Sequence, residues 1–294
     1  MMFMLKGLGF FFVALTLTKA SERTALSELG IYNYHDRIGI PEAKKIWYVE
    51  RELIRSGQRI AGGSTTTIFS VPYQAGLILT ISAIRNSVCG GTVISDTRIL
   101  TAAHCQNDGN NIVASITAVL GSNMLFAGGT RLTATGVVLH PGYNPWIVAN
   151  DIAVILVPRI SFSTMIQAVN LPSGSEINES FEGRTAVLSG FGVTSSGASV
   201  GLLQAISSVN LPVINNAECI RSYGNVIQAH HLCTSGANNR GACPGDTGGP
   251  LVVNINTRRV LIGVSSFFAT SGCTNGLPSG FSRVSSFVSW IHSI

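Results

Sequence analysis

Residues 60–294 consist largely of short apolar runs, each about as long as one β-strand. The runs are rich in β-branched residues and are separated by Gly, Asn and Ser, which favour turns. They cover residues 76–84, 91–103, 133–140, 151–157, 185–192, 249–255 and 259–268. Only 11% of the chain is charged and it contains 32 glycines, which suits many strands joined by tight turns. We therefore predict an all-β fold, a barrel or a sandwich.

The last ten residues, SSFVSWIHSI, have a different pattern. Phe287, Trp290 and Ile291 recur there at the spacing of a helix. We expect a short C-terminal helix that packs on the β-structure.

The first twenty residues have the parts of a secretion signal. Lys6 gives the positive start, residues 7–17 form the apolar part, and residues 18–20 end in the small Ala20. The apolar part is shorter than the roughly 20 residues that span a bilayer, so a signal peptide over residues 1–20 is favoured over a membrane anchor. We expect a secreted, extracellular protein.

Residues 21–59 contain 13 charged residues, far more densely than the rest of the chain. The part from 41 to 57 starts with a proline and has aliphatic residues at helical spacing, which predicts a short amphipathic helix. These residues are Ile46, Val49, Leu53 and Ile54. The stretch ends at the basic Arg59, which is followed by Ile60-Ala61-Gly62-Gly63, an apolar start and two glycines. This end favours a removable pro-segment over a permanent packing module.

From Ile60 onward there are 10 arginines, 8 acidic residues and no lysine, a net charge of +2. These charges are few and not clustered, which argues against a nucleic-acid partner. A lysine, with a pKa of about 10.4, would begin to lose its charge in a strongly alkaline medium, whereas an arginine would not. The absence of lysine fits such a medium, and it equally fits chance in a charge-poor chain.

All six cysteines also lie after Ile60. They are Cys89, Cys105, Cys219, Cys233, Cys243 and Cys273. An even number behind a secretion signal predicts disulfides, with 15 connectivities open from the sequence alone. Zinc is the competing interpretation, but no Cys-x-x-Cys pair or clustered Cys/His tetrad occurs. The loop after Cys105 carries only Asp108, too few carboxylates for calcium. We expect disulfides, and neither a metal nor a cofactor.

Three separate segments carry chemically useful side chains. TAAHC ends with His104 next to Cys105, NDIAVILV begins with Asp151 after an asparagine, and GDTGGP presents Thr247 on a glycine-rich turn. Each segment alone has an ordinary structural explanation: a core histidine, a turn-capping aspartate, a hairpin loop. Together with a secretion signal and a pro-segment, the order His, Asp, hydroxyl indicates nucleophilic catalysis.

These segments resemble the chymotrypsin family of serine peptidases, and the resemblance extends over the whole of residues 60–294. It rests on RIAGG, CGGTVISDTRILTAAHC, DIAVILV and CPGDTGGPL, and on the C-terminal stretch with Trp290. The pro-segment and SGFGVTSSG look most like digestive chymotrypsins and collagenases of insects, especially moths. The resemblance implies two six-stranded antiparallel β-barrels with the site between them. It also implies the pairs Cys89–Cys105, Cys219–Cys233 and Cys243–Cys273.

The resemblance gives each chemical group a role. A neutral hydroxyl is a poor nucleophile, so the His104 imidazole would take the Thr247 proton and return it to the leaving amine. Asp151 would accept the other imidazole N–H and stabilise the imidazolium. The backbone N–H groups of Gly245 and Thr247 would form the oxyanion hole. Cleavage after Arg59 would free an ammonium on Ile60, and this would pair with the buried carboxylate of Asp246.

The residue six positions before Thr247 is expected at the base of the specificity pocket. It is Gly241, which cannot bind a basic side chain as an aspartate would, so we expect neutral or apolar residues before the scissile bond. The pocket walls are assigned to Phe268 and Ser279, and Phe268 would narrow the pocket and favour small side chains. Ser266 is assigned as a further substrate-binding residue. A protein with this preference would not cut after its own Arg59, so a trypsin-like peptidase is expected to activate it.

Thr247 is the departure from the family pattern. Its extra methyl stiffens χ1 and crowds a site suited to serine. A misplacement of about 1 Å can reduce the rate on the order of a hundredfold. Two hypotheses follow. The first is a slow secreted endopeptidase, which the resemblance to digestive enzymes would place in an alkaline gut lumen. The second is an inactive homologue that acts as a binding or regulatory protein without turnover.

The expected partners are protein or peptide substrates, the activating peptidase and protein inhibitors, and the family default is a monomer. Asn178 lies in the only Asn-x-Ser/Thr sequon, and its glycosylation is left open.

Overall fold

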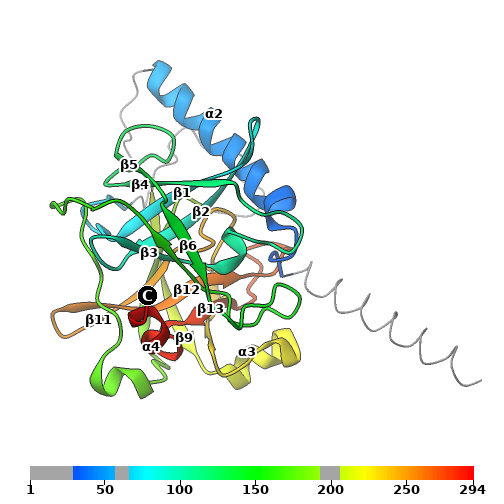
Figure 1. The fold of residues 1–294 in the computed structure, drawn as a ribbon. Helices are drawn as coiled ribbons and strands as arrows, with labels where there is room; N and C mark the ends of the chain where they lie inside the picture. The colour runs from blue at the N-terminus through cyan, green and yellow to red at the C-terminus, as the bar shows by residue number, and fades with distance from the viewer. Residues whose placement is uncertain (1–28, 57–65, 193–205) are drawn as a thin grey trace, which may run out of the picture.

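The structure is a computed structural model that describes residues 29–56, 66–192 and 206–294. The expected signal peptide and the Arg59–Ile60 junction lie outside these ranges. Within them, two antiparallel β-sheets form the body of the protein, and a long N-terminal helix lies on the outside of the first (Figure 1).

The first sheet is made by residues 74–156 and has the strand order β5-β4-β1-β2-β3-β7-β6. Its strands are β1 (Gln74–Ser82), β2 (Arg85–Val93), β3 (Arg98–Thr101), β4 (Ser115–Leu120), β5 (Thr130–Thr133), β6 (Gly136–Leu139) and β7 (Ala153–Leu156). Only two residues separate β5 from β6, although these strands lie at opposite ends of the order. The N–H of Ala134 donates to the carbonyl of Ile116 in β4, the strand that pairs with β5. The N–H of the next residue, Thr135, donates to the carbonyl of Leu156 in β7, the strand that pairs with β6. The chain therefore closes this sheet through one bent stretch, and counting β5 and β6 as one strand gives a six-stranded barrel.

The second sheet is a closed barrel with the order β10-β13-β12-β11-β8-β9. Its strands are β8 (Thr185–Gly190), β9 (Ser207–Ile214), β10 (His231–Thr234), β11 (Pro250–Ile255), β12 (Arg258–Phe267) and β13 (Ser279–Arg283). The two barrels confirm the predicted all-β fold class. In the described part of the chain, no helix is both long and apolar enough to cross a membrane.

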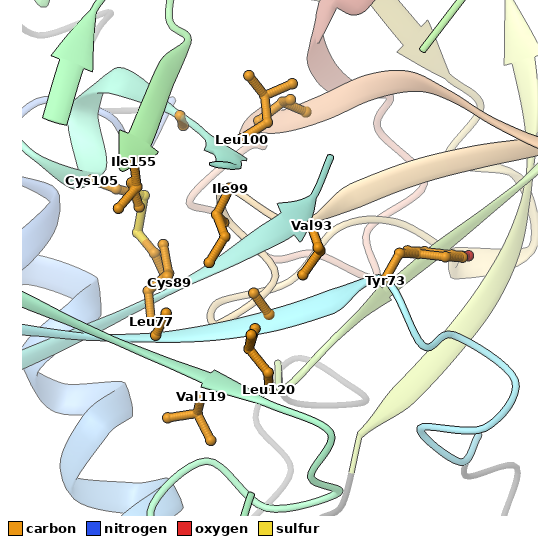
Figure 2. Packing of buried hydrophobic residues seen from close by; sticks show 14 of the residues in the cluster. Tyr73, Leu77, Cys89, Val93, Ile99, Leu100, Cys105, Val119, Leu120 and Ile155 are labelled. Atoms are coloured by element: carbon orange, nitrogen blue, oxygen red, sulfur yellow. A yellow bond between two sulfur atoms is a disulfide. The ribbon is translucent and has the colours of Figure 1, made fainter. Parts of the chain in front are cut away.

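Each barrel is filled by the inward side chains of its strands. Figure 2 shows the interior of the first barrel, where Leu77, Ile99 and Ile155 point toward one another from β1, β3 and β7. In the second barrel, Leu211 and Ile262 are fully buried. Burying one such side chain contributes roughly 1.5–3 kcal/mol, so these interiors supply the main driving force for the fold.

The helix predicted at the C-terminus is present as η6 (Val284–Ser286) followed by α4 (Val288–His292). Phe287 and Ile291 are buried, and the rings of Phe287 and Trp290 lie 5.1 and 4.9 Å from that of His140 at the end of β6. The end of the chain thereby joins the core of the first barrel.

The N-terminal described residues form η1 (His35–Gly39), which runs directly into α2 (Ile40–Ser56). The apolar face of α2 packs against the first barrel through Ile46, Val49 and Leu53, which are all buried. Ile54 was expected on the same face, but it is 61% exposed because it follows Leu53 directly and points about 100° further round the helix.

The remaining elements are short. They are η2 (Ala103–Cys105), η3 (Gly174–Asn178), α3 (Asn216–Tyr223), η4 (Gly224–Val226) and η5 (Ala237–Asn239). Asn215 caps α3 by accepting the N–H of Glu218 at 2.8 Å. Ser173 and Glu176 form a capping box at the start of η3.

Candidate active site

The pairing of β3 with β7 places His104 beside Asp151. Thr101 at the end of β3 is paired with Ala153 at the start of β7, so the residues just after β3 meet those just before β7. His104 Nδ1 lies 2.7 Å from one carboxylate oxygen of Asp151, and the His104 backbone N–H donates to the other at 2.9 Å. Both side chains are fully buried. The two contacts fix the imidazole so that Nε2 is the nitrogen left for proton transfer.

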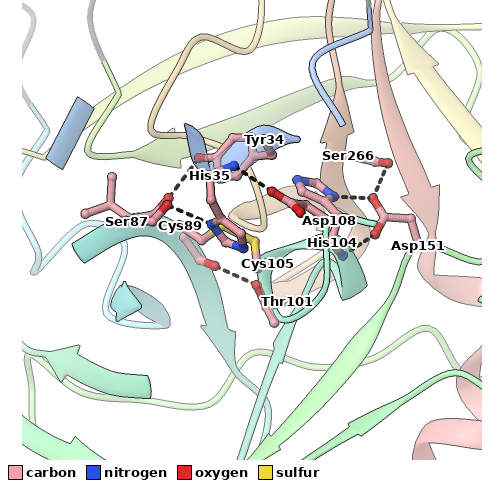
Figure 3. The surroundings of a disulfide bond; sticks show 12 residues. Tyr34, His35, Ser87, Cys89, Thr101, His104, Cys105, Asp108, Asp151 and Ser266 are labelled. Atoms are coloured by element: carbon pink, nitrogen blue, oxygen red, sulfur yellow. Dashed lines mark hydrogen bonds and ion pairs between the residues drawn. A yellow bond between two sulfur atoms is a disulfide. The ribbon is translucent and has the colours of Figure 1, made fainter. Parts of the chain in front are cut away.

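Further hydrogen bonds hold Asp151 from the second barrel. The Ser266 hydroxyl on β12 donates to its carboxylate at 2.6 Å, and the Ser282 hydroxyl on β13 donates to its backbone carbonyl at 2.6 Å. Burial acts to raise the pKa of Asp151, but the interactions with His104 and Ser266 outweigh it and hold the pKa below its usual value. The carboxylate is therefore ionised at neutral pH, as a partner for an imidazolium must be. Figure 3 shows His104, Asp151 and Ser266 together.

Thr247 lies on a turn that is pressed against β2. Its carbonyl accepts the N–H of Gly90 at 2.6 Å. A Cβ on Gly248, which has φ +81°, would lie 2.4 Å from the Thr101 hydroxyl and 2.5 Å from the Gly90 carbonyl. The glycines of the motif are thus required by the close contact between the barrels, and they place Thr247 at the same junction as His104.

The two atoms expected to react are both buried. Thr247 Oγ1 and His104 Nε2 are solvent-inaccessible, and neither makes a well-aligned hydrogen bond to another residue of the described ranges. The Thr247 hydroxyl lies near the phenol of Tyr34, whose pKa is raised by burial and lowered in smaller part by this hydroxyl. The Tyr34 ring also packs edge-on against His104, with centroids 5.1 Å apart. The site in the uncut chain is covered.

The Asp246 carboxylate is held by backbone N–H groups. It accepts the N–H of Cys243 at 2.9 Å and that of Gly192 at 3.1 Å. A Cβ on Gly190 or Gly192 would lie only 2.3 or 2.5 Å from Asp246 Oδ1, so both must be glycine for the carboxylate to take this place. Burial raises the pKa of Asp246 to about 7, because two backbone N–H groups offset only part of the lost hydration.

A cavity of about 150 Å³ adjoins the Asp246 carboxylate. Its lining includes Leu188, Gly190, Val209, Gly241 and Asp246. The cavity has a mixed lining, which also includes Ser207, Ser208, Asn239, Arg240 and Thr274. Its buried carboxylate is the feature that suits a positive charge.

Gly245 precedes this carboxylate with φ +96°, in the region that favours glycine. A Cβ there would lie 2.7 Å from the Cα of Gly192. The residue expected to supply one oxyanion donor is therefore packed tightly into the same turn as Thr247.

The residues assigned to the specificity pocket are only partly brought together. Gly241 and Ser279 are neighbours: a Cβ on Gly241 would lie 2.9 Å from the Ser279 hydroxyl, which accepts the N–H of Ala242 at 2.8 Å. Phe268 is buried in the same apolar cluster as Ala242. The Ser266 hydroxyl donates to Asp151, so this side chain also contacts the residue expected to support His104.

Three disulfides occur in the described part of the chain, between Cys89 and Cys105, Cys219 and Cys233, and Cys243 and Cys273. These are the pairs that the family resemblance implied. Cys89–Cys105 ties β2 to the turn of His104, and Cys243–Cys273 ties the Asp246 loop to the segment before β13. No group of three or more His, Cys, Asp or Glu side chains in the described ranges is placed to hold a metal ion.

Sequence reasoning missed three contributors to the site. Gly190 and Gly192 make room for Asp246, and their signal was the SGFG stretch, which had been used only as a family feature. Tyr34 covers His104, and nothing in its charged sequence surroundings pointed to the site.

Comparisons with known proteins agree with this geometry. The family model for Trypsin matches residues 60–291. The collagenase of Hypoderma lineatum is 37% identical over 239 residues, which cover 81% of this chain and 87% of that protein. The chymotrypsin of Phaedon cochleariae is 32% identical over 267 residues, 88% of this chain and 91% of its own. The brachyurin of Leptuca pugilator is 34% identical over 238 residues, 80% of this chain and 97% of its own.

A solved structure of HL collagenase superposes with a TM-score of 0.71 at 34% sequence identity. The match covers 80% of this chain and 97% of the collagenase chain.

Proposed function

The chain belongs to the trypsin family of serine proteases, and on that premise we propose that it is a secreted endopeptidase, made as a zymogen, with Thr247 as its nucleophile. The observation that carries the proposal is the buried His104–Asp151 pair, with Nδ1 and the carboxylate 2.7 Å apart. Tyr34 interacts with both His104 and the Thr247 hydroxyl, so these groups share one site. Protein or peptide substrates are the partners that this chemistry requires.

The proposed reaction is acyl transfer. Thr247 Oγ1 attacks the scissile carbonyl carbon while His104 Nε2 takes its proton, and the negative charge that forms on the carbonyl oxygen is bound by the N–H groups of Gly245 and Thr247. The imidazolium then gives the proton to the leaving amine as the C–N bond breaks, which leaves an ester on Thr247. Water, deprotonated by the same imidazole, hydrolyses the ester. Asp151 supports each protonated state of His104.

Activation is proposed to occur by a cut between Arg59 and Ile60. The family match begins at Ile60, and the buried Asp246 lines a cavity with both apolar and polar walls. An ammonium on Ile60 that entered this cavity would supply the countercharge that Asp246 lacks in the described ranges, and would lower its pKa from about 7. Arg59 requires a trypsin-like peptidase, because Gly241 leaves the pocket without a carboxylate at its base.

The proposed specificity is for neutral or apolar residues before the scissile bond. Gly241 offers no charge, and the neighbouring Ser279 hydroxyl is already hydrogen-bonded to Ala242 N–H. Phe268 is proposed to narrow the pocket from one wall.

The function is tested on a chain with a single cleavable site. Replacing Ser56→Ile, Gly57→Glu and Gln58→Gly creates Ile-Glu-Gly-Arg before Ile60, which a protease specific for that sequence cuts without touching the other basic residues. The cut protein should begin at Ile60, hydrolyse peptides after apolar residues, and be labelled on Thr247 by a hydroxyl-directed phosphonylating inhibitor. His104→Ala should abolish both hydrolysis and labelling. A correctly cut and folded protein that has been separated from the segment before Ile60, and that neither hydrolyses peptides nor is labelled, would be an inactive homologue.

A further inference from the structure

We propose that residues 29–56 are a reversible inhibitor of the peptidase domain, which stays bound in the substrate cleft after the cut at Arg59 and must dissociate before the enzyme works. The proposal rests on the proposed function for its turnover readout. The segment is called the N-terminal plug below.

The first step is that Tyr34 of the plug occupies the centre of the site. Its side chain is fully buried, its ring contacts His104, and its hydroxyl donates to the Val88 carbonyl at 2.8 Å. Val88 directly precedes the cysteine that is bonded to Cys105, so Tyr34 bridges the catalytic histidine and β2. A substrate could not reach His104 without displacing this ring.

The second step is that the flanks of Tyr34 are also bound. His35 donates its backbone N–H to Asp108 at 2.9 Å and its ring contacts the Ser87 hydroxyl at 2.9 Å (Figure 3). Asp36 forms an ion pair with Arg85. A Cβ on Gly39 would lie 1.9 Å from the Ser87 hydroxyl, so the plug approaches β2 as closely as a glycine permits.

On the other side of Tyr34, the plug lies along the proposed specificity pocket. A Cβ on Gly30 would lie 3.5 Å from Thr270 and 3.9 Å from the Phe268 ring. The plug therefore crosses the cleft from the pocket wall to β2, with Tyr34 between them.

The third step is that the plug is not held as a substrate. A peptide that adds to a sheet edge is extended. Here Tyr34 N–H bonds to the Ile31 carbonyl, Arg37 N–H bonds to the Asn33 carbonyl, and η1 follows at once. In this turn the backbone groups of the plug are hydrogen-bonded to one another, whereas an extended substrate would offer them to the enzyme. The plug therefore blocks the site without presenting a scissile bond.

The fourth step is that α2 anchors the plug outside the cleft. Glu50 is buried and accepts the N–H groups of Leu125 and Phe126 at 2.5 and 2.7 Å. All of these contacts lie before Ser56, whereas the cut lies after it. Breaking the peptide bond after Arg59 therefore removes none of them.

The plug can nevertheless leave. Residues 21–59 contain no cysteine, so no disulfide ties them to the domain once the chain is cut. His35 Nε2 and Glu42 Oε1 are buried with no hydrogen-bond partner in the described ranges. Each unsatisfied group offsets part of the favourable free energy that packing gives to the binding of the plug. These features favour a dissociable inhibitor over a permanent subunit.

The activity test uses the full chain with the Ile-Glu-Gly-Arg site, cut once and assayed over a wide range of protein concentrations. A released inhibitor that is present in equal amount dissociates on dilution, so specific activity should rise as the protein is diluted. The specific activity of Tyr34→Ala should reach its plateau at a protein concentration at least tenfold higher than that of the wild type, because its plug binds more weakly. Tyr48→Ala is the matched control, because Tyr48 lies in the same plug but is 61% exposed, and it should behave as wild type. Specific activity that is independent of concentration in all three proteins would overturn the proposal.

Two readouts need no turnover. The cut plug should co-elute with the domain in gel filtration, and His104 in the uncut chain should resist carbethoxylation by diethyl pyrocarbonate. Tyr34→Ala should expose His104 to the reagent, Tyr48→Ala should not, and Tyr34→Phe, which keeps the ring, should stay largely protected even if Tyr34→Ala is unstable. Equal labelling in wild type and Tyr34→Ala would contradict the proposal. Protection of His104 in the uncut chain, with no turnover even after the cut domain has been separated from the plug, would support the plug and reject the peptidase function.

Discussion

The ring of Tyr34 lies edge-on against the imidazole of His104, at an interplanar angle of 68°. The two residues are separated by the proposed cleavage point, so one chain carries both the proposed catalytic base and the group that covers it. Activation then has two requirements. In the proposed activation, Asp246 receives a positive partner from Ile60, and Tyr34 leaves His104.

The first requirement predicts that Asp246→Asn permits the cut and prevents activity. Without the carboxylate, the Ile60 ammonium would be buried uncompensated, so we expect kcat/KM to fall at least about a hundredfold. N-terminal sequencing and peptide hydrolysis measure the two effects separately. Asp96→Asn is the control, because Asp96 pairs with Arg159 on the surface, and it should leave both unchanged. Full activity of cut Asp246→Asn would show that the pairing is not needed.

A pH dependence follows from His35. Burial is the main cause that lowers the pKa of His35 from 6.5 to about 4, so the packed plug favours the neutral ring. Between pH 6.5 and 4 the unfolded chain binds a proton on His35 more readily than the folded chain does. The stability that the buried neutral ring contributes is therefore complete above pH 6.5 and is lost progressively as the pH falls toward 4. The uncut wild type should therefore lose more stability over this range than His35→Gln, which does not titrate and can still hydrogen-bond to Ser87. Thermal unfolding of both proteins at several pH values measures the difference. Parallel curves would contradict the assignment.

The pocket prediction concerns Phe268. Peptides with Phe, Leu or Ala before the scissile bond should be cut in preference to those with Arg or Lys. Phe268→Gly should raise the ratio of kcat/KM for Phe to that for Ala, because the wall would recede. Phe162→Gly is the control, because the Phe162 side chain is 51% exposed and is not among the residues assigned to the site. It should leave the ratio unchanged. An unchanged ratio in Phe268→Gly would remove Phe268 from the pocket wall.

How far the sequence predicted the fold depended on how local each signal was. Strand-length runs and the spacing of Phe287, Trp290 and Ile291 are local patterns, and the barrels and terminal helix follow them. The closing of the first barrel through Ala134 and Thr135 is a consequence of register, which no single run reveals.

The same distinction holds for the candidate site. His104 and Asp151 could be predicted because each sits in a recognisable motif at a strand end, and β3 and β7 then bring them together. Tyr34 could not, because its place over His104 depends on how a charged segment folds back onto β2. Ser266 was assigned to substrate binding, and its hydroxyl also bonds to Asp151, a contact that only the packing of the two barrels decides.

The most direct test of the account is a comparison of three cut and plug-free proteins: wild type, Thr247→Ser and Thr247→Ala. Thr247→Ser removes one methyl group that crowds the site. A tenfold to hundredfold rise in kcat corresponds to about 1.4–2.7 kcal/mol of transition-state stabilisation. We predict that kcat rises roughly ten- to hundredfold in Thr247→Ser and falls well below wild type in Thr247→Ala, where the hydroxyl is lost. A wild type that is indistinguishable from Thr247→Ala, whether or not Thr247→Ser is active, would contradict the claim that Thr247 is a working nucleophile.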